Sequence, residues 1–197
     1  ALPLNTEGRE RDLAKYRIHY DRWFRESALH ADGSVMKVVE LLKEKGHTYE
    51  AEGATWFKAT EFGADKDFVL VRSNGVPTYV VPDIAYHYGK LVTRGYDKAI
   101  DVLGADHHGY VPRLKAALQA LGVDPDRLDV VLLQMVRLIR DGEVVKASKR
   151  SGKAITLVTL LDEVPIDAAR FYFNLREANS QFDFDLDLAV EQSSQNP

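Results

Sequence analysis

The chain has 197 residues, of which 45% are hydrophobic and 28% are charged, and its formal net charge is −4. This composition is typical of a globular protein and excludes a disordered chain, and the length suits one compact catalytic unit. The negative charge argues against a protein that coats nucleic acid through an excess of Lys and Arg, and we expect no DNA partner.

The sequence contains no cysteine, which excludes disulfides and metal sites built on thiolates. No apolar run approaches the roughly 18 residues that a membrane span needs, and the first ten residues lack the pattern of a secretory signal. We therefore expect no membrane partner and a cytoplasmic location.

The first part of the chain predicts a helix followed by a small antiparallel element. From Ser34, a suitable N-cap, apolar residues recur on one helical face until Gly46, a C-terminal stop. Two runs of strand-forming residues, 68–71 and 76–81, then flank a four-residue segment that ends in Asn74-Gly75. Since an Asn-Gly pair supplies the positive φ angles of a tight turn, these runs favour a hairpin.

The middle of the chain predicts a strand, a helix and a second strand. A short strand at 99–103 ends at Gly104, and a helix then runs between Pro112, which suits its first turn, and Gly122, which closes it. The nearly unbroken apolar run 130–136 resembles a strand that is buried on both faces, as in a parallel sheet. This order predicts a βαβ unit and hence an α/β fold.

The last part of the chain predicts two helices and a strand. The helices are expected at 156–164 and 167–175, the second with Ala168, Phe171, Tyr172 and Leu175 on one side. From residue 182 to residue 188, large apolar residues alternate with aspartates, which locally favours a strand.

The segment Gly104-Ala-Asp-His-His-Gly-Tyr110 lies just beyond the carboxyl end of a predicted strand, where open α/β sheets bind ligands. Gly104 would let a ligand approach the backbone, Asp106 can accept two hydrogen bonds from a ribose diol, and His107 and His108 can donate to phosphate or stack on a base. An equally open alternative is a turn in which Asp106 caps the helix and the histidines pack inward. Adjacent histidines rarely chelate one ion, so no metal site is predicted.

The second motif, residues 140–153, follows the second predicted strand of the βαβ unit. Lys146, Ser148, Lys149 and Arg150 form a cationic segment that can close over a polyphosphate and neutralise charge that develops during phosphoryl or adenylyl transfer. The spacing is not that of a Walker loop. Taken alone, Lys-x-Ser-Lys is a weak pattern, and most such stretches are exposed loops.

In this order, the two motifs resemble those of class I aminoacyl-tRNA synthetases, and of the arginyl-tRNA synthetases in particular. The runs 104–115 and 141–152 are similar to family signatures, and the second corresponds to the KMSKS loop. Ala147 stands where that loop usually has methionine or another apolar residue. Residues 167–173 and 183–189 resemble the segment that leads into the tRNA-contacting helices, so that the similarity covers nearly the whole chain.

The resemblance implies an α/β fold that is part of a Rossmann-like nucleotide-binding catalytic domain, with a small antiparallel β insertion and C-terminal helices. Residues 1–76 would be the end of a connective insertion, with helices and a β-hairpin. Residues 77–164 would be the second half of the Rossmann-like domain, with the KMSKS-type loop. Residues 165–197 would lead toward an anticodon-binding domain.

The resemblance also implies residue roles. Matching family positions place Tyr79 and Asp83 in the arginine pocket, and a guanidinium is well recognised by a carboxylate and an aromatic ring. Without the resemblance, Asp83 would be a helix N-cap before Ile84 and Tyr79 a strand aromatic. The resemblance further implies that ATP is bound by Gly104, Asp106, His107 and His108. It implies that catalysis on the polyphosphate is carried out by Lys146, Ser148, Lys149 and Arg150.

The implied activity is that of a ligase which activates arginine with ATP, accompanied by Mg²⁺, and passes it to tRNA(Arg). A HIGH-type motif would precede the matching region and an anticodon-binding domain would follow it, so we expect the C-terminal part of a catalytic domain that is inactive alone. One alternative is a non-catalytic synthetase-like module that binds RNA, nucleotide or protein. Another is a different α/β nucleotidyltransferase, which would have no reason to keep Tyr79 and Asp83.

Overall fold

The computed structural model describes residues 2–145 and 156–192, with side chains from residue 5 onward. The chain forms two compact units. The central unit comprises residues 24–132, and the terminal unit comprises residues 1–23 and 133–197. The predicted division at residues 76 and 164 follows the architecture of a family and not internal packing, so it stays a prediction.

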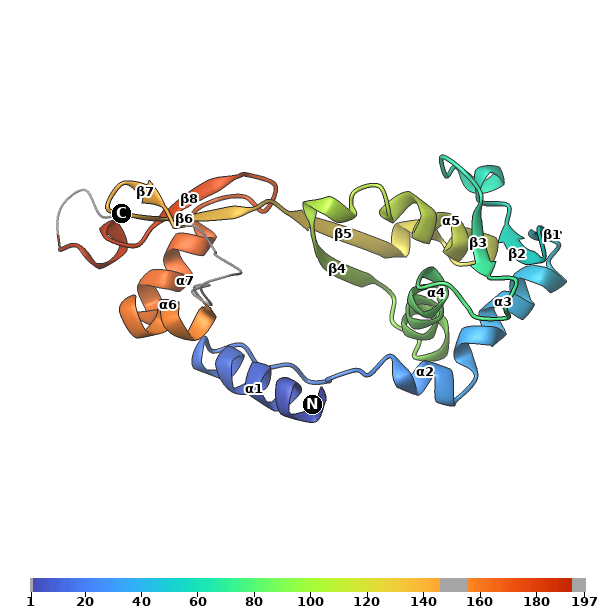
Figure 1. Ribbon diagram of the computed structural model, residues 1–197, viewed down its shortest axis with the longest axis horizontal. Helices are drawn as coiled ribbons and strands as arrows, with labels where there is room; N and C mark the ends of the chain where they lie inside the picture. Colours follow the sequence, from blue (N-terminus) through green and yellow to red (C-terminus); the bar gives the residue numbers. More distant parts are fainter. Residues whose placement is uncertain (1, 146–155, 193–197) are drawn as a thin grey trace. The chain divides into compact units, whose positions relative to one another are not determined.

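The central unit contains three α-helices around one strand-helix-strand core, together with a small sheet (Figure 1). Its largest fully buried side chains include Leu42, Phe57, Leu70, Ile84 and Leu118, which come from helices and strands alike. In chain order its helices and strands are α2 (Ser27–Ala31), α3 (Ser34–Glu44), β1 (Thr48–Ala51), β2 (Ala54–Phe57), β3 (Phe68–Val71), α4 (Val80–Tyr88), β4 (Ala99–Gly104), α5 (Val111–Ala120) and β5 (Leu128–Leu133).

Helix α3 confirms the first predicted helix, and the apolar residues of its predicted face, Val35, Val38, Val39 and Leu42, are buried. The expected cap is wrong in detail, because Ser34 is the first helical residue and Gly33, with φ 79°, precedes the helix. The carboxylate of Asp32 accepts a hydrogen bond of 2.9 Å from the Ser34 amide and thereby takes the role expected of the serine. Gly46 ends the helix region with φ 76°, as predicted.

The predicted hairpin is only half confirmed. Strand β3 forms, but it pairs with β2, which in turn pairs with β1, in an antiparallel sheet. The returning run 76–81 makes a single bridge at Pro77 and then enters α4. The turn itself is present, with Gly75 at φ 77°. The β-branched residues Val80 and Val81 locally favour a strand, but their burial on the inner face of α4 outweighs this preference.

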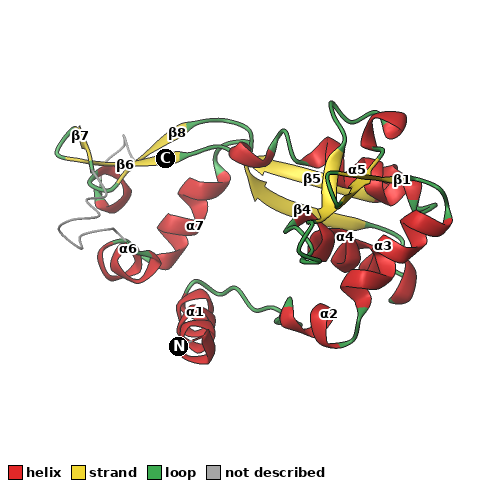
Figure 2. Ribbon diagram, turned by 45° about the vertical axis from the view of Figure 1, so that its right-hand side comes forward, coloured by secondary structure: helices red, strands yellow, loops and turns green. Residues whose placement is uncertain are grey.

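The predicted strand-helix-strand unit is confirmed as β4, α5 and β5. The two strands are hydrogen-bonded neighbours, and Figure 2 draws their arrows in the same direction. The expectation that the second strand is buried on both faces is wrong, because exposed and less exposed residues alternate along β4 and β5. Ile100 and Val102 are 62% and 61% exposed, and Val131 on β5 is also exposed. One face of this sheet is therefore apolar and open within the central unit.

The terminal unit contains a second three-stranded sheet, in which β6 (Val136–Arg140) lies between β7 (Glu143–Val144) and β8 (Phe182–Asp185). Strand β6 is antiparallel to β7 and parallel to β8, so the strand expected in residues 182–188 is confirmed. The single predicted run 130–136 thus splits between β5 and β6. The helices of this unit are α1 (Leu2–Lys15), α6 (Leu157–Glu163) and α7 (Ile166–Asn174).

Both predicted C-terminal helices form, and the Thr156 hydroxyl caps α6 by accepting a bond from the Thr159 amide. The buried face of α7 differs from the prediction, because Ala169 and Tyr172 are buried whereas Phe171 is 49% exposed. These buried residues pack with Phe184 of β8, which gives this unit a core of its own.

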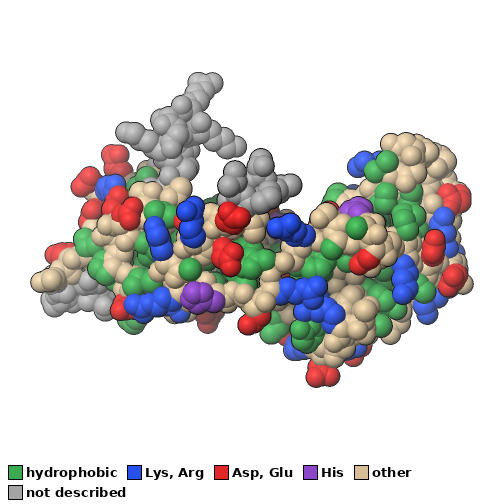
Figure 3. Space-filling view, turned by 90° about the horizontal axis from the view of Figure 1, so that it is seen from below, with side chains coloured by type: hydrophobic (Ala, Val, Ile, Leu, Met, Phe, Trp, Pro, Cys, Tyr) green, Lys and Arg blue, Asp and Glu red, His purple; other side chains and the backbone are tan. Residues whose placement is uncertain are grey.

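The structure confirms the α/β fold class. On the face shown in Figure 3, acidic and basic side chains are scattered among apolar ones, in keeping with the small net charge. None of the helices in the described part of the chain is both long and apolar enough to cross a membrane.

Candidate functional site

Tyr79 and Asp83 lie at the start of α4. Tyr79 immediately precedes the helix and is 70% exposed, and Asp83 lies in the first turn. The alternative interpretation of Asp83 as an N-cap is wrong, because Tyr79 occupies the cap position; for the same reason Tyr79 is not a strand residue. A carboxylate in the first turn is favoured by the helix dipole, and an aromatic ring one turn earlier is free to meet a ligand.

The partner of Asp83 is a tyrosine from the next helix. The hydroxyl of Tyr110, at the start of α5, donates a hydrogen bond of 2.6 Å to Oδ2 of Asp83. Burial, followed by the hydrogen bond and the charge of Asp83, raises the pKa of Tyr110 above its usual value. The hydroxyl therefore stays protonated at neutral pH and remains a donor. The ring of Tyr110 also lies beside that of Tyr79, with centroids 6.1 Å apart.

A nearly buried charged cluster lies one turn further along α4. Nδ1 of His87 is 2.7 Å from the backbone oxygen of Asp83, and Nε2 is 2.5 Å from Asp101 on β4. Lys90 donates a bond of 2.9 Å to the other oxygen of Asp101. The carbonyl can only accept, so Nδ1 carries a proton, and Nε2 donates to the carboxylate when the ring is doubly protonated.

The cluster changes the titration of its acid. Burial by itself raises the pKa of Asp101, but the hydrogen bonds and charges of His87 and Lys90 outweigh it and hold the pKa below its usual value. All three side chains are at most 15% exposed. The cluster thus ties α4, which carries Asp83, to β4, which ends at Gly104.

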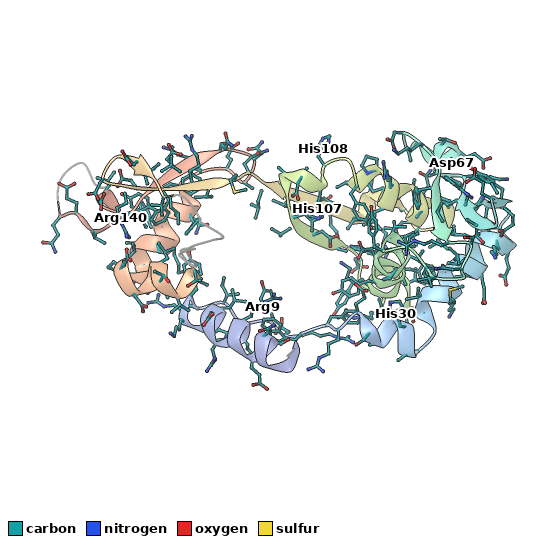
Figure 4. All side chains as sticks on the ribbon, in the orientation of Figure 1. Arg9, His30, Asp67, His107, His108 and Arg140 are labelled. Atoms are coloured by element: carbon teal, nitrogen blue, oxygen red, sulfur yellow. The ribbon has the colours of Figure 1, made fainter. Side chains whose placement is uncertain are left out.

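The predicted nucleotide-binding residues form the turn after β4. Gly104 ends the strand, Asp106 and His107 follow in the short 3₁₀ turn Ala105–His107, and His108 comes directly after it (Figure 4). The side chain of Asp106 is 84% exposed, and its Oδ1 is 3.1 Å from Nδ1 of His107. A Cβ at position 104 would lie 2.6 Å from the same Oδ1, so glycine is what lets this carboxylate fold back over the strand end.

The open alternative for this turn is wrong. The N-cap of α5 is Tyr110 and not Asp106, and both histidines are exposed instead of packed inward. The side chains of the turn therefore remain accessible to a ligand, but little in the protein holds them in place.

A cavity of about 190 Å³ adjoins Tyr79 and Tyr110 on the side of β3. Its lining includes Arg113 but not Asp83. Nε of Arg113 is 3.5 Å from Asp65 and has no hydrogen-bond partner among the described residues. Because the charge of Arg113 repels another guanidinium, this cavity is not a suitable place for an arginine head group.

The four residues of the predicted polyphosphate loop, Lys146, Ser148, Lys149 and Arg150, lie outside the described residues. Within the described residues, no group of three or more His, Asp or Glu side chains is placed to hold a metal ion. The geometry of the site therefore rests on α4, α5 and the turn after β4.

Comparison with known proteins identifies the family. Residues 11–189 match the model of the catalytic domain of class I tRNA synthetases for arginine, described as "tRNA synthetases class I (R), catalytic domain". The chain belongs to the class I arginyl-tRNA synthetase family. It is 59% identical over 196 residues to the arginine–tRNA ligase of Caldanaerobacter subterraneus and 50% identical to that of Bacillus subtilis. These alignments cover all of this chain but only 35% of each relative.

Solved structures support the same family and fold. A crystal structure assigned to an arginyl-tRNA synthetase of Campylobacter jejuni superimposes with a TM-score of 0.88 and 37% identity, over 95% of this chain and 40% of that one. The arginyl-tRNA synthetase of Thermus thermophilus gives a TM-score of 0.73 at 20% identity, over 91% of this chain and 40% of that one, which shows a shared fold.

Sequence reasoning within this family missed three residues that the structure joins to the site. His87 follows Asp83 by four residues, and this spacing on a helix was a usable signal of contact. Asp101 lies on a strand and Tyr110 at a helix start, 27 residues from Asp83. No local pattern connects such distant positions, so only the fold could reveal these two.

Proposed function

We propose that this chain is part of the catalytic domain of an arginine–tRNA ligase, which activates arginine with ATP and transfers it to tRNA(Arg). One observation carries the proposal beyond family membership: Asp83 is half-buried, accepts a hydrogen bond from Tyr110, and lies one helical turn from the exposed ring of Tyr79. A guanidinium is a planar fork of donors that suits this carboxylate and ring.

In the first step, an oxygen of the arginine carboxylate attacks the α-phosphorus of ATP, and the bond from that phosphorus to the pyrophosphate leaving group breaks. Tyr79 and Asp83 would hold the side chain of arginine. They would thereby position the reacting carboxylate at the other end of the amino acid. Gly104 and Asp106 would bind the nucleoside, and His107 and His108 would face phosphate or base. Lys146, Ser148, Lys149 and Arg150 would neutralise charge that develops on the polyphosphate.

In the second step, a hydroxyl of the terminal tRNA ribose attacks the arginyl carbonyl and releases AMP. Mg²⁺ would accompany ATP in the first step. Mg²⁺ generally keeps several waters and binds through substrate phosphates together with one or two carboxylates. The described residues contain no group of three or more carboxylates or histidines placed to hold it.

We further propose that the chain is the C-terminal part of the catalytic domain, and the open apolar face of β4 and β5 supports its being one part of a larger domain. A two-stranded sheet with Ile100 and Val102 more than half exposed is an unusual end state for a stable core. We propose that these strands belong to a larger parallel sheet and that elements from the remaining part of the synthetase cover this face.

Substitution on the open face tests this placement. Ile100→Asp should lower the yield and the melting temperature of the intact synthetase, because it puts a charge into a covered interface. The same change in the 197-residue chain should have little effect, because there the side chain is 62% exposed. An intact synthetase that tolerates Ile100→Asp would contradict the placement.

The segment boundaries at residues 76 and 164, the cytoplasmic location and the inactivity of the isolated chain remain parts of the proposal. Reading residues 1–76 as an insertion is supported by the small antiparallel sheet of β1, β2 and β3, which stands apart from the β4–β5 pair in hydrogen bonding.

The activity itself is tested with an intact protein that contains this chain. Twenty amino acids are offered in turn, with ATP and total tRNA, and both pyrophosphate exchange and tRNA charging are measured. Arginine alone should support both reactions. Nucleotide or RNA binding without turnover would favour a non-catalytic module, and preference for another amino acid would reject the arginine pocket.

A further inference from the structure

We propose that Tyr110 is a positioning residue for arginine recognition, which holds the Asp83 carboxylate in the orientation that receives the guanidinium. This inference rests on the proposed function of Asp83 as the arginine-binding acid. Tyr110 lies within the motif assigned to the nucleotide, so the same turn would serve both substrates.

The geometry supports a positioning role and not direct binding. Tyr110 donates to Oδ2 of Asp83 at 2.6 Å, which uses one of the four lone-pair positions of the carboxylate. Oδ1 and the second lone pair of Oδ2 remain for a ligand with two parallel donors. Among the described residues, no other side chain donates to Asp83. The bond from Tyr110 is therefore the contact that fixes the rotation of the carboxylate about its Cβ–Cγ bond.

The surroundings of Tyr110 make the bond a strong one. The tyrosine is half-buried, and its raised pKa means that the hydroxyl keeps its proton at neutral pH. The bond pairs a neutral donor with a charged acceptor, a class that contributes more than a bond between neutral groups. The ring of Tyr110 also lies 6.1 Å from the ring of Tyr79, so it limits where the exposed tyrosine can move.

Asp83 is held from its backbone side as well. Its carbonyl accepts from His87, which is fixed in turn by Asp101. With the backbone anchored by this cluster and the carboxylate oriented by Tyr110, the acid is preorganised before any ligand arrives. Removal of the Tyr110 hydroxyl alone should leave the backbone anchor intact and release only the carboxylate.

The test is Tyr110→Phe in the intact synthetase, with Tyr86→Phe as the matched control. Tyr86 is a half-buried tyrosine on α4 whose ring stacks on Phe24 at 4.4 Å, so phenylalanine keeps its packing. Calorimetry gives the affinities for arginine and for ATP. Tyr110→Phe should weaken arginine binding by about tenfold and leave ATP binding within about twofold, whereas Tyr86→Phe should change neither.

A double-mutant cycle with Asp83→Asn separates this inference from the function on which it rests. In the Asp83→Asn background, Tyr110→Phe should cost clearly less arginine affinity, because the carboxylate to be positioned is gone. If Asp83→Asn alone leaves arginine affinity unchanged, the arginine site is wrong. If Asp83→Asn weakens binding but Tyr110→Phe does not, only the role of Tyr110 is overturned.

A purely structural role for Tyr110 is also distinguishable. A structural role predicts that Tyr110→Phe lowers the affinities for arginine and ATP together, in proportion to the fall in melting temperature. It also predicts that the effects of Tyr110→Phe and Asp83→Asn on arginine affinity are additive. Either result would overturn the positioning role. If Tyr110→Phe gives too little protein, Tyr110→His offers a ring with a donor nitrogen. This variant should then bind arginine more tightly than variants that lack a donor at position 110.

Discussion

Asp83 and Asp106 are both proposed to bind a substrate, yet their surroundings differ sharply. Asp83 is half-buried, receives the Tyr110 hydroxyl and is anchored through its backbone to His87. The side chain of Asp106 is 84% exposed, and its contact is the adjacent His107. The residue proposed for arginine is thus built into the fold, whereas the residue proposed for the nucleoside remains free to adapt to its ligand.

This difference has a physical consequence for binding. A preorganised acid loses little entropy when the ligand arrives, so that its contribution appears mainly as affinity and specificity. An exposed acid on a short turn must be ordered by the ligand itself.

The largest effect is expected at the charged cluster that anchors α4. Asp101→Ala leaves His87 and Lys90 without their shared acid, and removal of one partner from a buried ion pair costs about 3–5 kcal/mol of stability. Asp129→Ala on the neighbouring strand is the control, because its pair with Lys98 is about half exposed and should contribute less than about 1 kcal/mol. Urea unfolding of the two variants measures the difference, and equal losses would contradict the anchoring role.

The same cluster predicts a pH dependence. The folded-state pKa of Asp101 lies below its usual value of about 4, so its contribution to stability is complete above that value. The contribution is lost as the pH falls through the folded-state pKa. The stability difference between wild type and Asp101→Ala that comes from this charge should therefore be constant from pH 7 down to about pH 4 and shrink only below that. A difference that stays constant down to pH 3 would show that the charge of Asp101 is not what stabilises the fold.

Substitution in the predicted polyphosphate loop should lower the reaction rate and not the stability. Lys149→Ala in the intact synthetase should slow adenylate formation by about 3 kcal/mol of transition-state stabilisation, with little change in arginine affinity. Lys153→Ala removes the same charge from the same segment and should have a smaller effect. Pyrophosphate exchange in the presence of tRNA, together with arginine titration, distinguishes the two. An equal loss of arginine affinity would count against the phosphate role.

The smallest effect on stability is expected at the exposed acid. Asp106→Ala should weaken ATP binding by about 1–2 kcal/mol, and it should change stability by less than about 0.5 kcal/mol because little of the protein depends on this side chain. ATP titration and urea unfolding measure both quantities. Unchanged ATP affinity would remove Asp106 from the nucleotide site, and a large stability loss would show that the turn is more constrained than its exposure indicates.

The sequence predicted those elements whose periodicity was long or whose ends carried clear signals. Helix α3 is an example, since four buried positions recur at helical spacing and Gly46 closes the element. The strand-helix-strand unit was also found, since Gly104, Pro112 and Gly122 mark its borders. Its exposure was mispredicted, because an apolar run shows which residues prefer burial and not what covers them.

Other features depend on contacts between distant residues. Val80 and Val81 have the local preference of a strand, yet they are buried on α4 by packing that no short window contains. In the candidate site, the predicted pair Tyr79 and Asp83 was found through family resemblance. Tyr110, which donates to Asp83, lies in the 104–110 motif, but no local pattern predicts this contact because its partner lies 27 residues earlier in the chain.

The central claim is that Asp83 binds arginine, and Asp83→Asn in the intact synthetase tests it most directly. Asparagine keeps the size of the side chain and can still accept from Tyr110, but it loses the charge and turns a donor toward the guanidinium. Calorimetric titration with arginine and with ATP, beside a melting curve, should show arginine binding weakened by about 2–5 kcal/mol, with ATP affinity and melting temperature nearly unchanged. Unchanged arginine affinity, or a loss that only follows thermal stability, would contradict the claim.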